Sequence, residues 1–425
     1  MTEPRRAPGA PWYVRTFNHL SAAAAELGLA RPEALRPEAL RQAARRRAPQ
    51  CYSFASPALK DPLERLCADV DRHSRASATG RIAMVEHLVE LLAARLRLVR
   101  RWEQVGEGRV AAEPVERPVF IFGLPRTGTT LLHNLIAQDP DVRVPWTYEV
   151  MMPTSQPGAL SRGARRAAVG KRLRWVDRLA PDFRSVHEVS ATLPQECIAI
   201  TAHALQSIEF HTTHRLPDYE NWLEQSDQRP AYAFHRRFLQ HLQHEDRLDG
   251  SDHSSFDARR WVLKAPGHLF ALEALLDAYP DAVLVQTHRD PLEVVASISS
   301  HGVILRQAFS DQVDPHEVAS DWSARWCGAL ERTLALRARE PELNARILDV
   351  HYQQTLSDPI DTIAAIYAHA GLSLSEQARA RMATYLTRNP QGRHGRHRYS
   401  LEEFGLSRNA EQERYASYRH WLGLA

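Results

Sequence analysis

The sequence contains few cysteines and carries almost no net charge. Its four cysteines, at positions 51, 67, 197 and 327, include no Cys-x-x-Cys pair. Their spacing therefore gives no sign of a structural zinc site or a dithiol redox centre. The 54 lysines and arginines nearly balance the 51 aspartates and glutamates, which leaves a formal net charge of +3 over 425 residues. Bulk charge thus offers no reason to expect a nucleic-acid or membrane partner.

Long uninterrupted apolar runs are also missing. The first residues, MTEPRRAPGAPWYVRTF, are polar and lack the apolar core of a signal peptide. The most apolar long stretch, residues 82–99, contains Glu86, Glu90, Arg95 and Arg97, and a bilayer would not accept so many charges. We therefore expect a cytoplasmic protein with no membrane span.

The most informative stretch is PVFIFGLPRTGTT, residues 118–130, together with the LLHNLIAQ that follows. Four apolar residues between Pro118 and Gly123 predict a buried strand of a parallel sheet. Leucines at helical spacing predict a helix that begins near Gly128. A strand, a glycine-bounded loop and a helix N-terminus together favour anion binding, because unpaired N–H groups and the helix dipole meet there.

The loop has the Gly-x4-Gly spacing of a nucleotide-binding P-loop but lacks its lysine. Thr129 stands where a lysine would reach the β- and γ-phosphates of ATP or GTP. A cation occurs instead inside the loop, at Arg126. A guanidinium fork at that place suits the oxygens of a monophosphate or a phosphosulfate. The pattern therefore favours a sulfuryl donor over a phosphoryl donor.

Three later segments repeat the order of apolar strand and polar cluster. Residues 261–263 precede Lys264, residues 282–286 precede THRDP at 287–291, and residues 345–350 precede a His-Tyr pair. We predict an α/β fold of the P-loop type, with three layers around a central parallel sheet and its ligand at the carboxyl ends of the strands. We expect three parts: a helical N-terminal region at 1–114, a catalytic domain at 115–400, and a helical tail at 401–425 that packs on the catalytic domain.

Several histidine and arginine clusters have plain interpretations. Each of the pairs 211/214 and 241/244 has helical spacing but no third ligand at a convincing distance, so we predict no metal site. The basic run at 161–175 is typical of a solvated helix. The basic residues at 389–399 fit either a flap over an anionic nucleotide or an exposed loop, and both interpretations stay open.

Taken together, these motifs resemble the sulfotransferases that use 3′-phosphoadenosine-5′-phosphosulfate (PAPS), over about residues 115–399. The resemblance implies that the loop holds the 5′-phosphosulfate through five residues: Arg126, Thr127, Gly128, Thr129 and Thr130. An arginine at this position of the loop resembles the tyrosylprotein branch of the family. Many cytosolic members have a lysine there instead.

The segment at 287–291 resembles the family's 3′-phosphate-binding segment. Arg289 follows the strand end, where its guanidinium group could donate two hydrogen bonds to a phosphate. Ser297, two helical turns further on, would add a hydroxyl donor. ATP has no 3′-phosphate, so this pair would give specificity for the donor. Tyr352 resembles, more weakly, a tyrosine near the donor.

The resemblance also implies the catalytic groups. Lys264, in LKAPGH, is similar to a lysine that stabilises charge at the reacting centre in the tyrosylprotein branch. Arg126 would share that task. Some family members use histidine as the general base and others a glutamate soon after the donor loop. Glu149 is the first candidate here, and His187 and Glu196 are the alternatives.

The predicted function is transfer of a sulfuryl group from PAPS to the hydroxyl of a small molecule, lipid or natural product, with no metal and no nucleic-acid partner. Aromatic and apolar residues across 146–235 favour an apolar acceptor. A homo-oligomer is one option. A P-loop phosphoryl-transfer enzyme and a non-catalytic nucleotide-binding protein are the alternatives.

Overall fold

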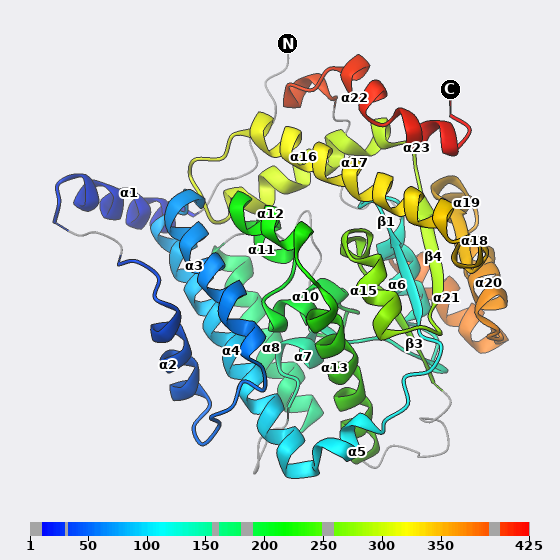
Figure 1. The fold of residues 1–425 in the computed structure, drawn as a ribbon, viewed down its shortest axis with the longest axis horizontal. Helices are drawn as coiled ribbons and strands as arrows, with labels where there is room; N and C mark the ends of the chain where they lie inside the picture. Colours follow the sequence, from blue (N-terminus) through cyan, green and yellow to red (C-terminus); the bar gives the residue numbers. More distant parts are fainter. Residues whose placement is uncertain are drawn as a thin grey trace.

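The computed structural model describes residues 11–29, 33–154, 161–179, 190–248, 259–390 and 400–424. His187 lies outside these residues, as does nearly all of the basic segment predicted at 389–399. Figure 1 shows a sheet seen almost edge-on, with helices on both of its faces.

The sheet has five parallel strands in the order β2-β3-β1-β4-β5. Strand β1 (Val119–Gly123) is central, between β3 (Arg260–Lys264) and β4 (Val283–His288). The short β2 (Val142–Arg143) and β5 (Ile347–His351) form the edges. Strand β1 is buried along its whole length because helices cover both faces, which explains its continuous apolar run. The predicted α/β fold with a parallel sheet is confirmed.

Alternate residues of β1 point into two different cores. Val119 and Ile121 belong to a small cluster with α6 (Thr129–Ile136), α20 (Pro359–Ala370) and α21 (Glu376–Arg388). Phe120 and Phe122 belong to a much larger cluster on the opposite face. This period of two produces the three layers.

Apart from α1 and α8, the helices before β1 and between β2 and β3 contribute to the larger cluster. The N-terminal helices are α1 (Trp12–Glu26), α2 (Pro37–Arg47), α3 (Lys60–His73), α4 (Ala78–Val105) and α5 (Glu107–Ala111). The helices inserted between β2 and β3 are α7 (Thr147–Met151), α8 (Arg162–Leu179), α10 (Cys197–Thr201), α11 (Glu209–Thr213), α12 (Pro217–Gln225) and α13 (Arg229–Leu248). Leu88, Leu92 and Leu96 of α4 share this core with the sheet, and a boundary at residue 114 stays a prediction.

The remaining helices follow β3, β4 and β5. They are α15 (Leu272–Ala278), α16 (Pro291–Gln307), α17 (Pro315–Arg339), α18 (Pro341–Ala345), α19 (Tyr352–Ser357), α22 (Arg408–Arg414) and α23 (Ala416–Trp421). Figure 1 shows α22 and α23 lying across the end of the sheet, beside α16 and α17. Within the described residues, no helix combines the length and apolar character that crossing a bilayer requires.

Glu220, in α12, gives a stability prediction. Its side chain is fully buried, and neither carboxylate oxygen has a hydrogen-bond partner among the described residues. Burial outweighs the attraction of Arg325 and raises the pKa of Glu220 to about 8, well above the usual range of a glutamate. The folded protein therefore keeps this proton up to a pH at which the unfolded chain has lost it, so stability falls as the pH rises from about 5 to 8.

Glu220→Gln removes this dependence. We expect the variant to gain on the order of 3 kcal/mol of unfolding free energy over the parent between pH 5.5 and pH 8.5, measured by urea denaturation. Glu38→Gln, at an exposed position of α2, serves as the control and should track the parent. An equal pH dependence in the parent and Glu220→Gln would show that Glu220 is not protonated in the folded state.

Candidate active site

The loop after β1 needs unusual backbone geometry at both of its ends. Gly123 has φ +146°, and a Cβ at this position would lie 2.4 Å from the carbonyl oxygen of Thr287 in β4. Arg126 has φ +69°, and Gly128, which caps α6, has φ +88°. Left-handed residues within a tight turn point successive N–H groups into one concavity, which favours an anion. With the N-terminus of α6 added, the loop is built to hold a phosphate-like group.

The side chain of Thr127 stabilises the loop itself. It is fully buried, and its hydroxyl lies 2.7 Å from the carbonyl oxygen of Leu124 and 2.6 Å from Oγ1 of Thr287. Thr129 is buried as well, whereas Thr130 and Arg126 are exposed. Of the five predicted loop residues, Thr127 can thus offer a ligand its N–H group, while its hydroxyl ties the loop to β4.

The structure brings the two predicted arginines together. Nη1 of Arg289, just after β4, donates to the carbonyl oxygen of Arg126 at 3.3 Å. The guanidinium of Arg289 lies 4.3 Å from the centre of the Tyr352 ring, and its Nε donates to Glu293 at 3.1 Å. Ser297 is half-buried on α16. The loop and the segment after β4 therefore border one site at the carboxyl end of the sheet.

Lys264 ends β3 on the other side of the loop. Its side chain is 3% exposed, and its ammonium donates to Thr130 Oγ1 at 3.3 Å and forms an ion pair with Glu196 Oε1. Glu196 directly precedes α10. An ammonium, a hydroxyl and a carboxylate thus meet beside the anion loop. This set can transfer a proton and stabilise a growing negative charge in the same place.

Glu149 lies instead in a buried ion-pair network. Its Oε1 accepts hydrogen bonds from Arg143 at 2.8 Å and from the Tyr148 hydroxyl at 3.0 Å, while its Oε2 accepts from the backbone N–H of Trp146 at 3.0 Å. Arg143 also bonds Asp246 at 2.9 Å. Both oxygens hold the first turn of α7 in place, as in a capping box. This geometry argues against the prediction that Glu149 is the general base.

The segment that carries Glu196 is held against the start of α7. Gln195 donates its N–H to the carbonyl oxygen of Pro145 at 2.7 Å, and Thr147 donates to that of Leu193 at 3.0 Å. A bridge between Trp146 and Pro194 continues the pairing. These contacts fix the backbone of the residue that reaches Lys264.

The C-terminal helix supports the segment around Arg289, a role that no sequence motif indicated. The Tyr418 hydroxyl lies 2.7 Å from Nδ1 of His288, and Arg419 forms an ion pair with Asp290. Nε2 of His288 lies 2.8 Å from Asp349. Burial would raise the pKa of Asp349, but hydrogen bonds from Arg337 and His288 outweigh it and hold that pKa below its usual range. Arg289 is therefore flanked by two residues anchored in the fold.

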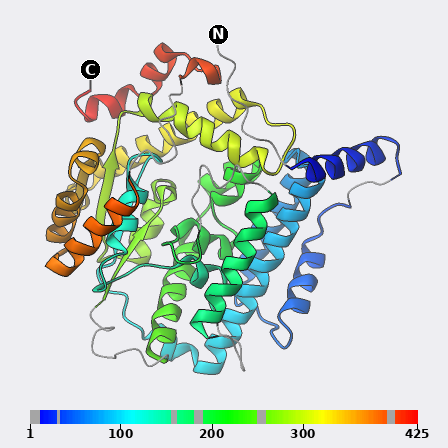
Figure 2. The same ribbon diagram turned by 180° about the vertical axis from the view of Figure 1, so that it is seen from behind.

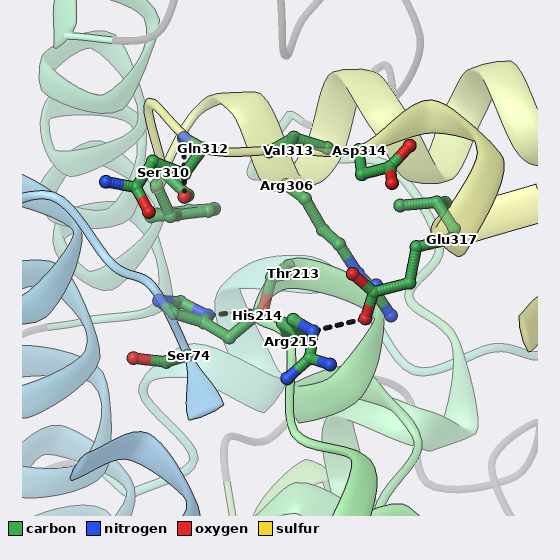
Figure 3. Close-up of a pocket in the computed structure, with 12 residues that line it drawn as sticks. Ser74, Thr213, His214, Arg215, Arg306, Ser310, Gln312, Val313, Asp314 and Glu317 are labelled. Atoms are coloured by element: carbon green, nitrogen blue, oxygen red, sulfur yellow. Dashed lines mark hydrogen bonds and ion pairs between the residues drawn. The ribbon is translucent and has the colours of Figure 1, made fainter. Parts of the chain in front are cut away.

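A separate polar pocket lies at the other end of α16. Figure 3 shows Arg215 pointing toward Glu317 from the segment before α12, with Arg306 above them. The pocket holds about 10 Å³, room for roughly one water molecule. His211, close by, lies 2.6 Å from Asp321, and burial lowers its pKa to about 4. Because these charges are paired with one another, the pocket is a poor candidate for the reaction site.

A model of the sulfotransferase family matches residues 118–376. The match begins at β1 and includes the anion loop, Glu196, Lys264, Arg289 and Tyr352.

Individual relatives agree with the family match. The ω-hydroxy-β-dihydromenaquinone-9 sulfotransferases Stf3 of Mycobacterium bovis and Mycobacterium tuberculosis are 28% identical over 305 residues, which cover 67% of this chain and 71% of theirs. The crystal structure of sulfotransferase STF1 from M. tuberculosis H37Rv superimposes with a TM-score of 0.77 at 29% identity, over 91% of this chain and all of that one. STF9 from Mycobacterium avium gives 0.80 at 25% identity, over 91% of this chain and 97% of its own.

Proposed function

Because the chain belongs to the sulfotransferase family, we propose that it transfers a sulfuryl group from PAPS to the hydroxyl group of an apolar acceptor. Membership of the family implies PAPS as the donor. The observation that carries the proposal is the contact between the two arginine segments, in which Arg289 reaches the carbonyl of Arg126 at 3.3 Å. A guanidinium group that reaches the anion loop from the end of β4, together with the arginine of the loop itself, fits a ligand with phosphate groups at both its 5′ and 3′ positions.

In this proposal, each end of the donor has its own set of residues. Arg126 and the N–H groups of the loop from Thr127 to Thr130 hold the 5′-phosphosulfate, because they border the N-terminus of α6. Arg289 and Ser297 hold the 3′-phosphate. Tyr352, stacked on the Arg289 guanidinium, limits the orientations of that side chain and so reduces the entropy cost of donor binding.

The chemistry is an in-line displacement at sulfur. The acceptor oxygen forms a bond to sulfur while the bond from sulfur to the phosphate oxygen of PAPS breaks, and Glu196 takes the hydroxyl proton. Negative charge grows on the departing phosphate oxygen, where Lys264 and the loop N–H groups stabilise it. Glu196 replaces Glu149 as the base in this account because it shares the site with Lys264.

We propose that these cations suffice without a metal ion. The transferred group carries less charge than a phosphoryl group, so the transition state demands less neutralisation. Arg126 belongs to the loop itself, and Lys264 ends β3, the strand next to β1. Activity in a chelator should therefore equal activity in magnesium.

The acceptor we propose is a hydroxylated lipid. The Stf3 relatives are named for an ω-hydroxylated dihydromenaquinone, and they match two-thirds of this chain. Trp146, at the start of the helical insertion, is partly exposed and pairs with Pro194, two residues before Glu196, so it can offer an apolar wall beside the proposed base. An apolar acceptor gains most from such surroundings.

The test is a mass-spectrometric search for sulfated products. The full chain is incubated with PAPS and a panel of fatty alcohols, hydroxylated prenyl quinols, phenols and sugars, with EDTA or with magnesium. We expect a sulfate adduct on a lipid alcohol in both conditions. Donor binding without any adduct would favour a non-catalytic nucleotide-binding protein, and magnesium-dependent turnover of ATP would favour phosphoryl transfer.

A further inference from the structure

Helix α1 carries an apolar stripe on its outer side. Tyr13, Phe17, Leu20 and Leu27 follow one another at helical spacing, and their residues are 46%, 47%, 67% and 73% exposed. The opposite side of the helix holds Asn18, whose Oδ1 accepts hydrogen bonds from the N–H and hydroxyl of Thr79. Figure 1 shows α1 projecting from the body of the molecule beside α3 and α4. A contiguous exposed stripe of this kind marks a contact surface.

Helix α8 presents a basic stripe. Lys171, Arg174 and Arg178 are all exposed and share one side of the helix. Trp175, 55% exposed, lies on the same side, with the Arg178 guanidinium 5.2 Å from the centre of its ring. Sequence alone predicted a solvated helix here, because it did not reveal which element lies next to it.

The two stripes adjoin each other. The Tyr13 hydroxyl donates to the carbonyl oxygen of Arg178 at 3.1 Å. Figure 2 shows α8 running beside α4 toward the base of α1. The combined surface, which we call the α1–α8 face, has an apolar part on α1 and a cationic part on α8. It consists of Tyr13, Phe17, Leu20, Leu27, Lys171, Arg174, Trp175 and Arg178.

We propose that the α1–α8 face docks on the surface of an anionic lipid bilayer. An amphipathic helix inserts its apolar side at the boundary between headgroups and acyl chains, lysine and arginine attract anionic headgroups, and tryptophan favours the same interface. A second copy of the chain is a poorer occupant. The α1–α8 face as defined contains no acidic residue, so where it packs on itself in a two-fold contact its cations would meet only apolar or like-charged groups.

The proposed membrane docking does not depend on which acceptor the enzyme sulfates. It places the protein against a membrane through two helices that contain none of the proposed donor-binding or catalytic residues. Loss of docking should therefore leave the sulfation of a water-soluble alcohol unchanged. Loss of docking would slow sulfation only when the substrate is embedded in vesicles.

Vesicle co-sedimentation of the full chain tests the proposal. We expect binding to phosphatidylcholine vesicles that contain phosphatidylglycerol, little binding to phosphatidylcholine alone, and weakening by salt. Phe17→Gln/Leu20→Gln and Arg174→Glu/Arg178→Glu should each lower the partition coefficient at least about tenfold. Glutamine and glutamate keep good helix propensity, and circular dichroism verifies that the helices persist.

Matched controls come from exposed positions away from this face. Leu248→Gln, at the end of α13, and Arg381→Glu/Arg408→Glu, on α21 and α22, should bind like the parent. Equal binding to both vesicle types, or none to either, would overturn the proposal. So would a dimer that Phe17→Gln/Leu20→Gln converts to a monomer while vesicle binding stays the same.

Discussion

Lys264→Met is expected to lower kcat by about 10²–10³-fold while the affinity for adenosine 3′,5′-bisphosphate changes little. The ammonium lies within hydrogen-bond reach of Thr130, at the start of the helix that ends the anion loop. Charge on the leaving phosphate oxygen grows only as the sulfur–oxygen bond breaks. A group that meets this charge stabilises the transition state much more than the bound donor.

Methionine preserves most of the volume of Lys264 in its buried site, so the comparison isolates the charge. Lys60→Met, at an exposed position at the start of α3, is the control and should keep full activity. Single-turnover rates with labelled PAPS and calorimetric titration of the bisphosphate separate chemistry from binding. Near-parental turnover in Lys264→Met with normal donor binding would remove Lys264 from the mechanism.

The second large effect separates the two glutamates. Glu196→Gln should lower kcat by about 10²–10⁴-fold, because glutamine keeps the shape of the side chain but cannot accept the hydroxyl proton. Glu149→Gln should instead destabilise the fold by about 3 kcal/mol, since it leaves the buried Arg143 with one carboxylate fewer. Its kcat, measured at a temperature where the variant is folded, should stay within a few-fold of the parent.

The pH profile distinguishes a base from a structural partner of Lys264. The parent should lose activity at acidic pH as the base becomes protonated, and the residual activity of Glu196→Gln should lack that acidic limb. Glu196→Asp, which keeps a carboxylate, should recover part of the rate. If Glu149→Gln were folded but inactive and Glu196→Gln active, the roles assigned here would be reversed.

The sheet was predictable because its central strands are defined by local chemistry. The apolar run that starts at Val119 sits between a proline and a glycine, and the strand occupies Val119–Gly123. The stretch at 82–99, too charged for a membrane span, forms part of the long helix α4 (Ala78–Val105). The edge strand β2 is two residues long, too short for a periodic pattern to appear.

The proximity of the loop and Arg289 could also be predicted from the sequence. Parallel strands bring their carboxyl ends to one edge, so polar clusters that follow neighbouring strands meet there. The meeting of Arg289 with Arg126 follows from the direct pairing of β1 with β4.

The sequence could not distinguish which glutamate lies beside Lys264 and is therefore the better candidate for the general base. A glutamate that caps a helix and one that accepts a proton look alike in sequence, and Glu149 proved to cap α7. Glu196 reaches Lys264 only because its segment pairs with residues near Trp146. Likewise, the support of His288 by Tyr418 joins residues 130 positions apart, with no motif to announce it.

If Arg126 and Arg289 bind opposite ends of one donor, the protein must distinguish nucleotides by their 3′-phosphate, and calorimetric titration measures this preference. The parent should bind adenosine 3′,5′-bisphosphate about ten- to a hundredfold more tightly than adenosine 5′-monophosphate, the value of a charge-assisted contact to the 3′-phosphate. Arg289→Ala should abolish this preference. Arg126→Ala should lower the affinity for both nucleotides to the same extent. An undiminished preference for the bisphosphate in Arg289→Ala would show that Arg289 does not bind the 3′-phosphate.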